Sequence, residues 1–186
     1  LRFMELGDRA IPILDQIRVE TKDKEEKKRA KDVLYKLTFT SLKEDFAELL
    51  LEGVGNRAQL ERAVITLARF GNPTLRESEY VKKLDYFADM IRSSLRYNRS
   101  EREEMQTFMK FIFEDLNFRG DNTDYHNPAN GFIDQVIERR KGLPISLSLV
   151  AMFIARRLQL PVFGVNMPIH FMLAFVGEKE EQLIDP

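Results

Sequence analysis

Hydrophobic positions recur with a helical period through the first two thirds of the chain. Apolar side chains three or four residues apart predict helices over residues 10–17, 22–36, 42–51, 59–70, 77–95 and 105–116. The segment 22–36 is highly charged, and its narrow apolar stripe predicts an αα-hairpin with one solvent-facing side. Pro12 requires the first helix to start near Ile11 or to bend there.

The period changes after Pro161. Residues 145–158 are apolar on nearly every side, which predicts a central buried helix with Pro144 at its first position. Gly142 is placed to end the short helix 132–140. Beyond Pro161, alternating apolar positions predict strands at 162–165, 171–176 and 182–184. A helix feeding an antiparallel sheet makes this end α+β.

The chain therefore divides, by this interpretation, into a helical extension at 1–70 and an α+β domain at 71–186. The first hairpin is similar to one HEAT-like repeat, and stable solenoids need about three repeats. We expect either further repeats before Leu1 or packing of this one on the rest of the chain. The sequence starts without Met and stops on Pro186, so we expect it to be a fragment.

Composition narrows the classes of function. Hydrophobic residues make up 44% and charged residues 32%, and 29 Lys and Arg against 30 Asp and Glu leave a net charge of −1. This balance gives no electrostatic footprint for nucleic acid or for anionic membranes. The absence of Cys excludes disulfides, thiolate metal sites and a thiol nucleophile. We expect a cytoplasmic protein without metal or cofactor.

Three side chains are candidates for chemistry. His170 opens an apolar strand, and Asp185 closes the next one, where its carboxylate could accept the ring N–H and fix the tautomer. A nucleophile would stand at the start of the buried helix, where the dipole favours negative charge, and Ser146 lies there. A serine in a first helical turn is more often a packing or capping residue. The other histidine, His126, belongs to a turn-rich loop and is expected to be exposed.

A family resemblance follows from several ordered blocks in residues 75–186. They are Phe118-Arg119-Gly120, Asn127-Pro128-Ala129-Asn130, the run from Val136 to Ser148, Pro168-Ile169-His170-Phe171 and Ile184-Asp185-Pro186. This order resembles the SirB-type branch of the transglutaminase-like superfamily. That branch includes bacterial proteins named as regulators of sirC expression, and a related domain occurs in some eukaryotic F-box proteins.

The resemblance implies a papain/transglutaminase-like core, with a buried helix on a small antiparallel sheet. In active members, a Gly-x-Cys motif starts the helix, and His and Asp-Pro complete the site. Aligning the glycine puts Pro144 at the Cys position, while His170 and Asp185 match the other two members. Ile169 stands where family members usually have a small residue. The family continues past Asp-Pro, which agrees with a truncated domain.

We favour a non-catalytic binding or regulatory module for a protein or peptide partner, with Pro144, Glu138, Arg140 and Asn130 around the relic site. The alternative is a serine-variant hydrolase or acyltransferase that uses Ser146, His170 and Asp185. A third hypothesis makes the chain a helical adaptor whose HEAT-like unit binds the partner. None of the three involves nucleic acid or a membrane.

Overall fold

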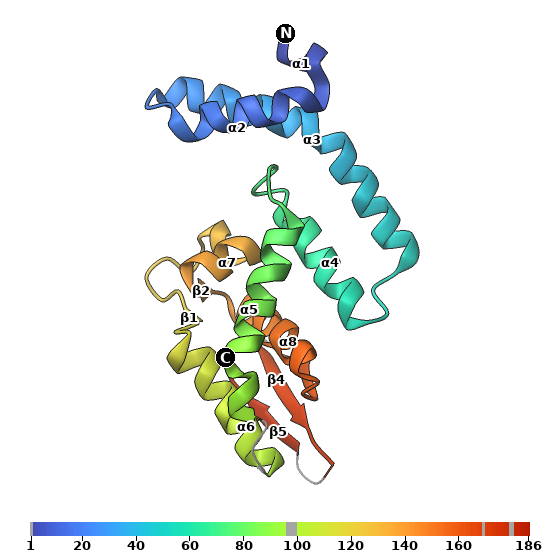
Figure 1. Ribbon diagram of the computed structural model, residues 1–186, viewed down its shortest axis with the longest axis vertical. Coiled ribbons are helices and arrows are strands. Elements are labelled where there is room, and N and C mark those ends of the chain that lie inside the picture. The colour runs from blue at the N-terminus through green and yellow to red at the C-terminus, as the bar shows by residue number, and fades with distance from the viewer. Residues whose placement is uncertain (1, 96–99, 169, 179–180) are drawn as a thin grey trace. The chain divides into compact units, whose positions relative to one another are not determined.

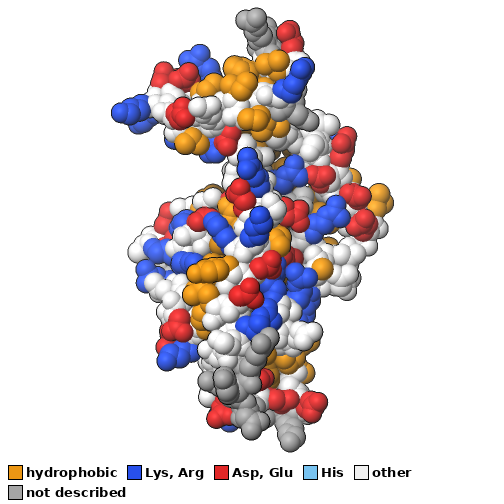
Figure 2. Space-filling model, in the orientation of Figure 1, with side chains coloured by type: hydrophobic (Ala, Val, Ile, Leu, Met, Phe, Trp, Pro, Cys, Tyr) orange, Lys and Arg blue, Asp and Glu red, His pale blue; other side chains and the backbone are white. Residues whose placement is uncertain are grey.

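The computed structural model describes residues 2–95, 100–168, 170–178 and 181–186 (Figure 1). The chain forms two compact units, Leu1–Arg76 and Glu77–Pro186. Side chains of both charge signs are interspersed over the visible face of the molecule (Figure 2), in keeping with the balanced composition.

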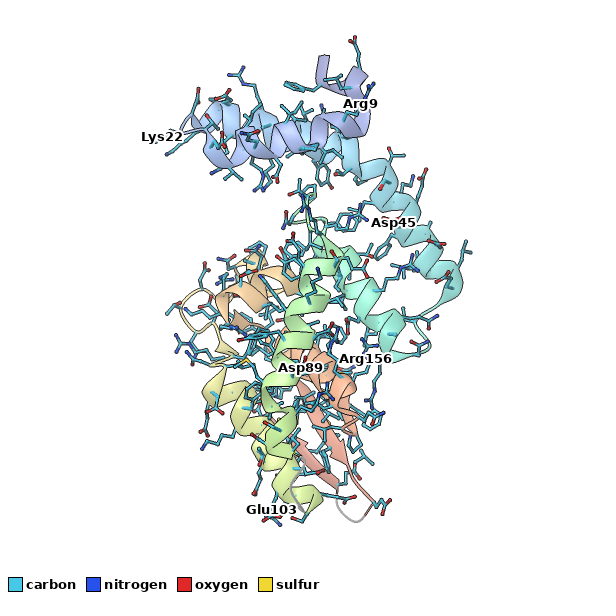
Figure 3. The ribbon with its side chains drawn as sticks, viewed as in Figure 1. Arg9, Lys22, Asp45, Asp89, Glu103 and Arg156 are labelled. Carbon is cyan, nitrogen blue, oxygen red and sulfur yellow. The ribbon has the colours of Figure 1, made fainter. Side chains whose placement is uncertain are left out.

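The first unit is helical. Its elements are α1 (Arg2–Leu6), the 3-10 turn η1 (Gly7–Ala10), α2 (Ile11–Glu20), α3 (Lys24–Glu52) and α4 (Arg57–Ala68). The α2–α3 hairpin buries a small core of Ala10, Leu14, Ala30 and Leu34. Arg69, just after α4, pairs with Asp45, which lies on α3 (Figure 3). The helix α2 begins at Ile11, with Pro12 in its first turn, where the missing N–H of proline costs no hydrogen bond.

The helical segments predicted at 22–36 and 42–51 lie on one continuous helix, the 29-residue α3, which begins at Lys24. No Gly or Pro interrupts the segment between them. Thr38, a poor helix former, is accommodated because its hydroxyl donates to the Leu34 carbonyl at 2.9 Å. The prediction that residues 42–51 continue as helix is therefore confirmed.

The second unit confirms the predicted α+β class. Its helical elements are α5 (Glu77–Leu95), α6 (Glu101–Lys110), the π-helical turn η2 (Phe111–Asp115), the 3-10 turn η3 (Pro128–Asn130), α7 (Ile133–Arg139) and α8 (Pro144–Leu158). The strands are β1 (Arg119–Gly120), β2 (Lys141–Gly142), β3 (Val162–Met167), β4 (His170–Val176) and β5 (Glu181–Ile184). The last three form an antiparallel sheet in the order β3-β4-β5, while β1 and β2 pair in parallel.

Helix α8 is the central element of this unit, as its sequence predicts. Pro144 is its first residue, and α8 contacts α5, α7, β3 and β4 (Figure 1). Most of its side chains are buried, including Val150, Phe153 and Ile154. The burial is not complete on every side, because Ile145 is 46% exposed. An apolar residue in the first turn of the helix is thus left in contact with water.

One face of the β3-β4-β5 sheet packs on helices. A Cβ added at Gly164 would approach the Phe171 ring at 2.5 Å and Met152 of α8 at 3.2 Å. Position 164 therefore faces α8. Leu173, its partner on β4, and Phe175, two residues further along β4, lie on the same face and are 0% and 3% exposed. The absence of a side chain at Gly164 makes room for the Phe171 ring.

The opposite face of the sheet is defined by the alternating positions. It carries Phe163, Val165, Met167, His170, Met172, Ala174, Val176, Glu181 and Leu183. We call it the open face, because Phe163, Met167, Val176 and Leu183 are between 39% and 48% exposed.

The expectation that Gly142 ends the helix at 132–140 was wrong. The residue that ends α7 is Arg140, in the left-handed conformation with φ of 58°. This conformation is unusual without glycine, and two contacts hold it here. The Arg140 carbonyl accepts from the Arg119 N–H at 3.0 Å, and its guanidinium lies 4.4 Å from the ring centre of Phe87 and 4.6 Å from that of Phe118.

Candidate functional site

His170 and Asp185 are in contact, as expected from their places at the ends of neighbouring strands. The Nε2 atom of His170 lies 2.7 Å from Oδ1 of Asp185. His170 is the first residue of β4, and Asp185 directly follows β5, which pairs with β4 through Leu173 and Ile184. The side chains are 38% and 68% exposed. The carboxylate fixes the orientation of the ring and leaves Nδ1 free of this bond.

The topology puts His170 at the same end of the unit as the start of α8. Only three residues join α8 to β3, so β3 begins beside the end of the helix and runs back along it. The helix is about 22 Å long and β3 about 20 Å. Met167 at the far end of β3 pairs with His170. The histidine therefore returns to the level of the first turn of α8.

Strand alternation, however, assigns His170 to the open face. Phe171 and Leu173 point toward α8, and His170 lies one residue before Phe171 on the same strand. The predicted approach of the ring to Pro144 and Ser146 thus stays a prediction, and the strand geometry argues against it.

Ser146 is engaged in the loop that precedes α8. Its Oγ lies 2.6 Å from the Asn130 carbonyl oxygen and 3.0 Å from that of Leu143, and the residue is 2% exposed. A hydroxyl has one proton to donate, and both neighbours accept it. Gly142 lies against this serine, since a Cβ added there would come within 2.5 Å of Ser146 Oγ. The structure therefore gives Ser146 a packing and loop-anchoring role.

Asn130 is the centre of a buried hydrogen-bond network. From the sequence alone, this residue was expected only in the surroundings of the site. It is fully buried, and its Nδ2 donates to the carbonyls of Asp124 at 2.7 Å and Tyr125 at 3.2 Å. Its Oδ1 accepts from Arg139 Nη1 at 3.0 Å. Its backbone carbonyl accepts from the N–H of Leu143 at 3.1 Å. The network ties the loop 121–130 to the start of α8.

Asp121 completes this network and was missed by the sequence analysis. It is 3% exposed, and its Oδ2 accepts from Arg139 Nη2 at 2.8 Å. The hydroxyl of Thr123, donating to Oδ1, and the ammonium of Lys141 lower the pKa of Asp121 to about 2, well below the usual value of an aspartate. A run of Asp and Asn in a loop reads as turn formers, so the burial of Asp121 has no signal in the sequence.

Glu138 and Arg140 serve helix packing rather than the His–Asp pair. Glu138 pairs with Lys83 on α5, and this lysine lies 5.2 Å from the ring centre of Tyr80. Arg140 contacts the rings of Phe87 and Phe118, and burial lowers the pKa of its guanidinium. Both residues were expected around the relic site. The structure instead joins α7 through them to α5.

Among the residues that the structure describes, no three His, Asp or Glu side chains gather in a way that could hold a metal ion. Within the same part of the chain, no helix has both the length and the apolar character needed to cross a bilayer.

Comparison with known proteins gives matches in bacteria and in animals. A UPF0162 protein of Xylella fastidiosa (strain Temecula1) is 35% identical over 104 residues, which is 52% of this chain and 37% of that protein. A UPF0162 protein of Vibrio cholerae is 32% identical over 125 residues, 67% of this chain and 40% of that protein. F-box only protein 21 of Homo sapiens is 40% identical over 74 residues, 40% of this chain and 12% of that protein. The chain thus spans less than half the length of these relatives.

No solved structure matches the chain. The sequence profile described as the transglutaminase-like superfamily matches residues 78–186, nearly the whole of the second unit. Both groups of relatives agree with the branch that the sequence blocks predicted. The chain therefore belongs to the transglutaminase-like superfamily, in its SirB-type branch.

Proposed function

We propose that this protein is a non-catalytic member of its superfamily and acts as a binding or regulatory module for a protein or peptide. The observation that carries the proposal is that no nucleophilic side chain stands at the position where active members have their Cys. The chain has no Cys, and Pro144 stands at the helix start where the resemblance puts the nucleophile. Acyl transfer by a covalent route needs an activated nucleophile at that place.

The surroundings of Ser146 support the same conclusion. A serine nucleophile needs a base within hydrogen-bond reach of its hydroxyl. The Ser146 hydroxyl is buried and has two carbonyl oxygens as acceptors, at 2.6 Å and 3.0 Å. To react, the hydroxyl would have to leave the Asn130 carbonyl and reach His170. Strand alternation assigns His170 to the face of the sheet opposite the one that α8 covers. We infer that the His–Asp pair orders the end of the sheet.

The serine-enzyme alternative rests on one observation, the intact contact between His170 and Asp185 at 2.7 Å. A carboxylate that orients an imidazole is the arrangement of base and orienting group found in hydrolases. This alternative requires a rearrangement of the α8 start that brings Ser146 to the ring.

The remaining parts of the proposal concern the whole protein. The name of the F-box relative agrees with a partner that is a protein. The α2–α3 hairpin is proposed to be a HEAT-like helical repeat that extends the transglutaminase-like domain. A cytoplasmic location is proposed because it fits a chain without Cys. The near-neutral charge of −1 supports a protein that does not bind nucleic acid.

Turnover of an activated ester tests the proposal. We expect wild type, Ser146→Ala and His170→Ala to hydrolyse p-nitrophenyl acetate at slow rates close to one another, because only exposed groups, the His170 imidazole among them, react with it. An acyl donor and a primary amine should likewise give no product. A rate that falls at least about 100-fold in both variants, the usual contribution of a general base, would support the serine enzyme instead.

A further inference from the structure

The open face of the β3-β4-β5 sheet presents exposed apolar side chains around Ala174 of the central strand, which is itself only 2% exposed. α6 and α8 lie over the other side, where Ile184 lines a pocket of about 310 Å³ with Met105 and Met109 of α6. On the open face, Met167, Val176 and Leu183 are 39%, 45% and 48% exposed. Single exposed apolar residues are ordinary, whereas a group on one face indicates an interaction site.

Apart from His170, which is bonded to Asp185, the ionisable side chains at the described positions of this face are acidic. Glu181 and Asp185 flank Leu183 on β5, and all three alternate on the same side of that strand. The described positions of the open face include no Lys or Arg. Asp185 is 68% exposed even with His170 beside it. A partner that covers the apolar positions therefore meets a row of carboxylates along the β5 edge.

The dimensions of the face suit a helix. Three strands spaced about 4.8 Å apart make a surface about 10 Å wide, close to the diameter of an α-helix. Glu181 and Asp185 are four residues apart on a strand, which separates them by about 13 Å. Two lysines seven residues apart on one flank of a helix are about 10.5 Å apart, and their long side chains span the difference.

We propose that the open face binds an amphipathic helix of a partner protein, with apolar side chains on the sheet and a basic flank over Glu181 and Asp185. The occupant is chosen by charge complementarity, because a helix with an acidic flank would place like charges together. This inference rests on the proposed function as a binding module and names the surface and the chemistry of the partner.

The absence of Cys from the chain permits a test without background labelling. In the full chain, Leu183→Cys puts one thiol on the open face, and Met90→Cys puts one on α5 at matched exposure, 47% against 48%. Both are labelled with N-ethylmaleimide. The probe is an 18-residue amphipathic helical peptide with Leu on one face and Lys on its flank. A second peptide carries Glu in place of each Lys.

Both thiols should react at similar rates without peptide. At a concentration of the Lys peptide ten times its Kd, labelling of Leu183→Cys should slow about tenfold, and labelling of Met90→Cys should not change. The Glu peptide should protect neither thiol. Met167→Cys provides a second position on the open face, and circular dichroism verifies that each variant is folded.

Three results would overturn the proposal. Slow labelling of both Leu183→Cys and Met167→Cys before peptide is added would mean that the face is already covered, by another part of the protein or by a second copy. Equal protection by the two peptides would remove the role of charge. Protection of Met90→Cys to the same extent would make binding non-specific. None of these outcomes depends on ester turnover, so loss of the docking surface and loss of the non-catalytic function are distinguishable.

Discussion

Replacing Phe153 with Ala is expected to lower the free energy of unfolding by about 3–5 kcal/mol, the range for a fully buried aromatic side chain. Phe153 is 1% exposed in the middle of α8, the helix that contacts α5 and the sheet. Removing the ring takes its apolar area out of the core and leaves a cavity between rigid elements.

Native-state hydrogen exchange of the α8 amides measures this effect directly, because it reports the opening of one unit in a two-unit chain. Leu149→Ala is the matched control on the same helix. Leu149 is only half-buried, so its truncation should cost clearly less than that of Phe153. A loss below about 1 kcal/mol at Phe153 would contradict the central place of α8 in the core.

Gly142→Ala is expected to cost about 1–3 kcal/mol, the usual penalty for an inserted group in a close-packed place. The new Cβ would lie 2.5 Å from Ser146 Oγ and 3.0 Å and 3.1 Å from the two γ-carbons of Val136. Because Ser146 is held by the Asn130 carbonyl at 2.6 Å, it cannot move away without breaking that bond. The close approach of the backbone at position 142 to Ser146 thus requires glycine there.

A double-mutant cycle with Ser146→Ala separates this clash from a general effect of the substitution. The cost of Gly142→Ala should shrink when the serine oxygen is absent, since only the contacts to Val136 then remain. Thermal or denaturant unfolding of the four proteins gives the coupling energy. Equal costs in the two backgrounds would mean that Ser146 Oγ does not occupy the place described for it.

The secondary structure of the second unit was largely predictable because its hydrophobic periods are strong. The switch at Pro161 predicted three strands, and the structure has them as β3, β4 and β5. Their antiparallel order brings His170 and Asp185 together, which a strand pattern can anticipate. The same reasoning predicted α8 with Pro144 as its first residue.

Features that depend on tertiary contacts were not predictable. The left-handed Arg140 needs Phe87 and Phe118, which come from α5 and from the segment before β1. The pairing of β1 with β2 involves only two residues in each strand, too few for any periodicity. The burial of Asp121 depends on Arg139, 18 residues away.

The predicted site and the structure differ most in the face of the sheet to which His170 belongs. The sequence placed the histidine at a strand start and a serine at a helix start, and both positions are correct. Only the contact of Gly164 with Phe171 and Met152 tells which face the helix covers. A one-residue change in register would have reversed it.

Covalent capture with a fluorophosphonate, read by intact-protein mass spectrometry, tests the central claim that the chain has no working nucleophile. We expect wild type to keep its unmodified mass, like Ser146→Ala and His170→Ala, because the Ser146 hydroxyl is buried and bound to backbone carbonyls. A single adduct on wild type that maps to Ser146 and disappears in His170→Ala would contradict it.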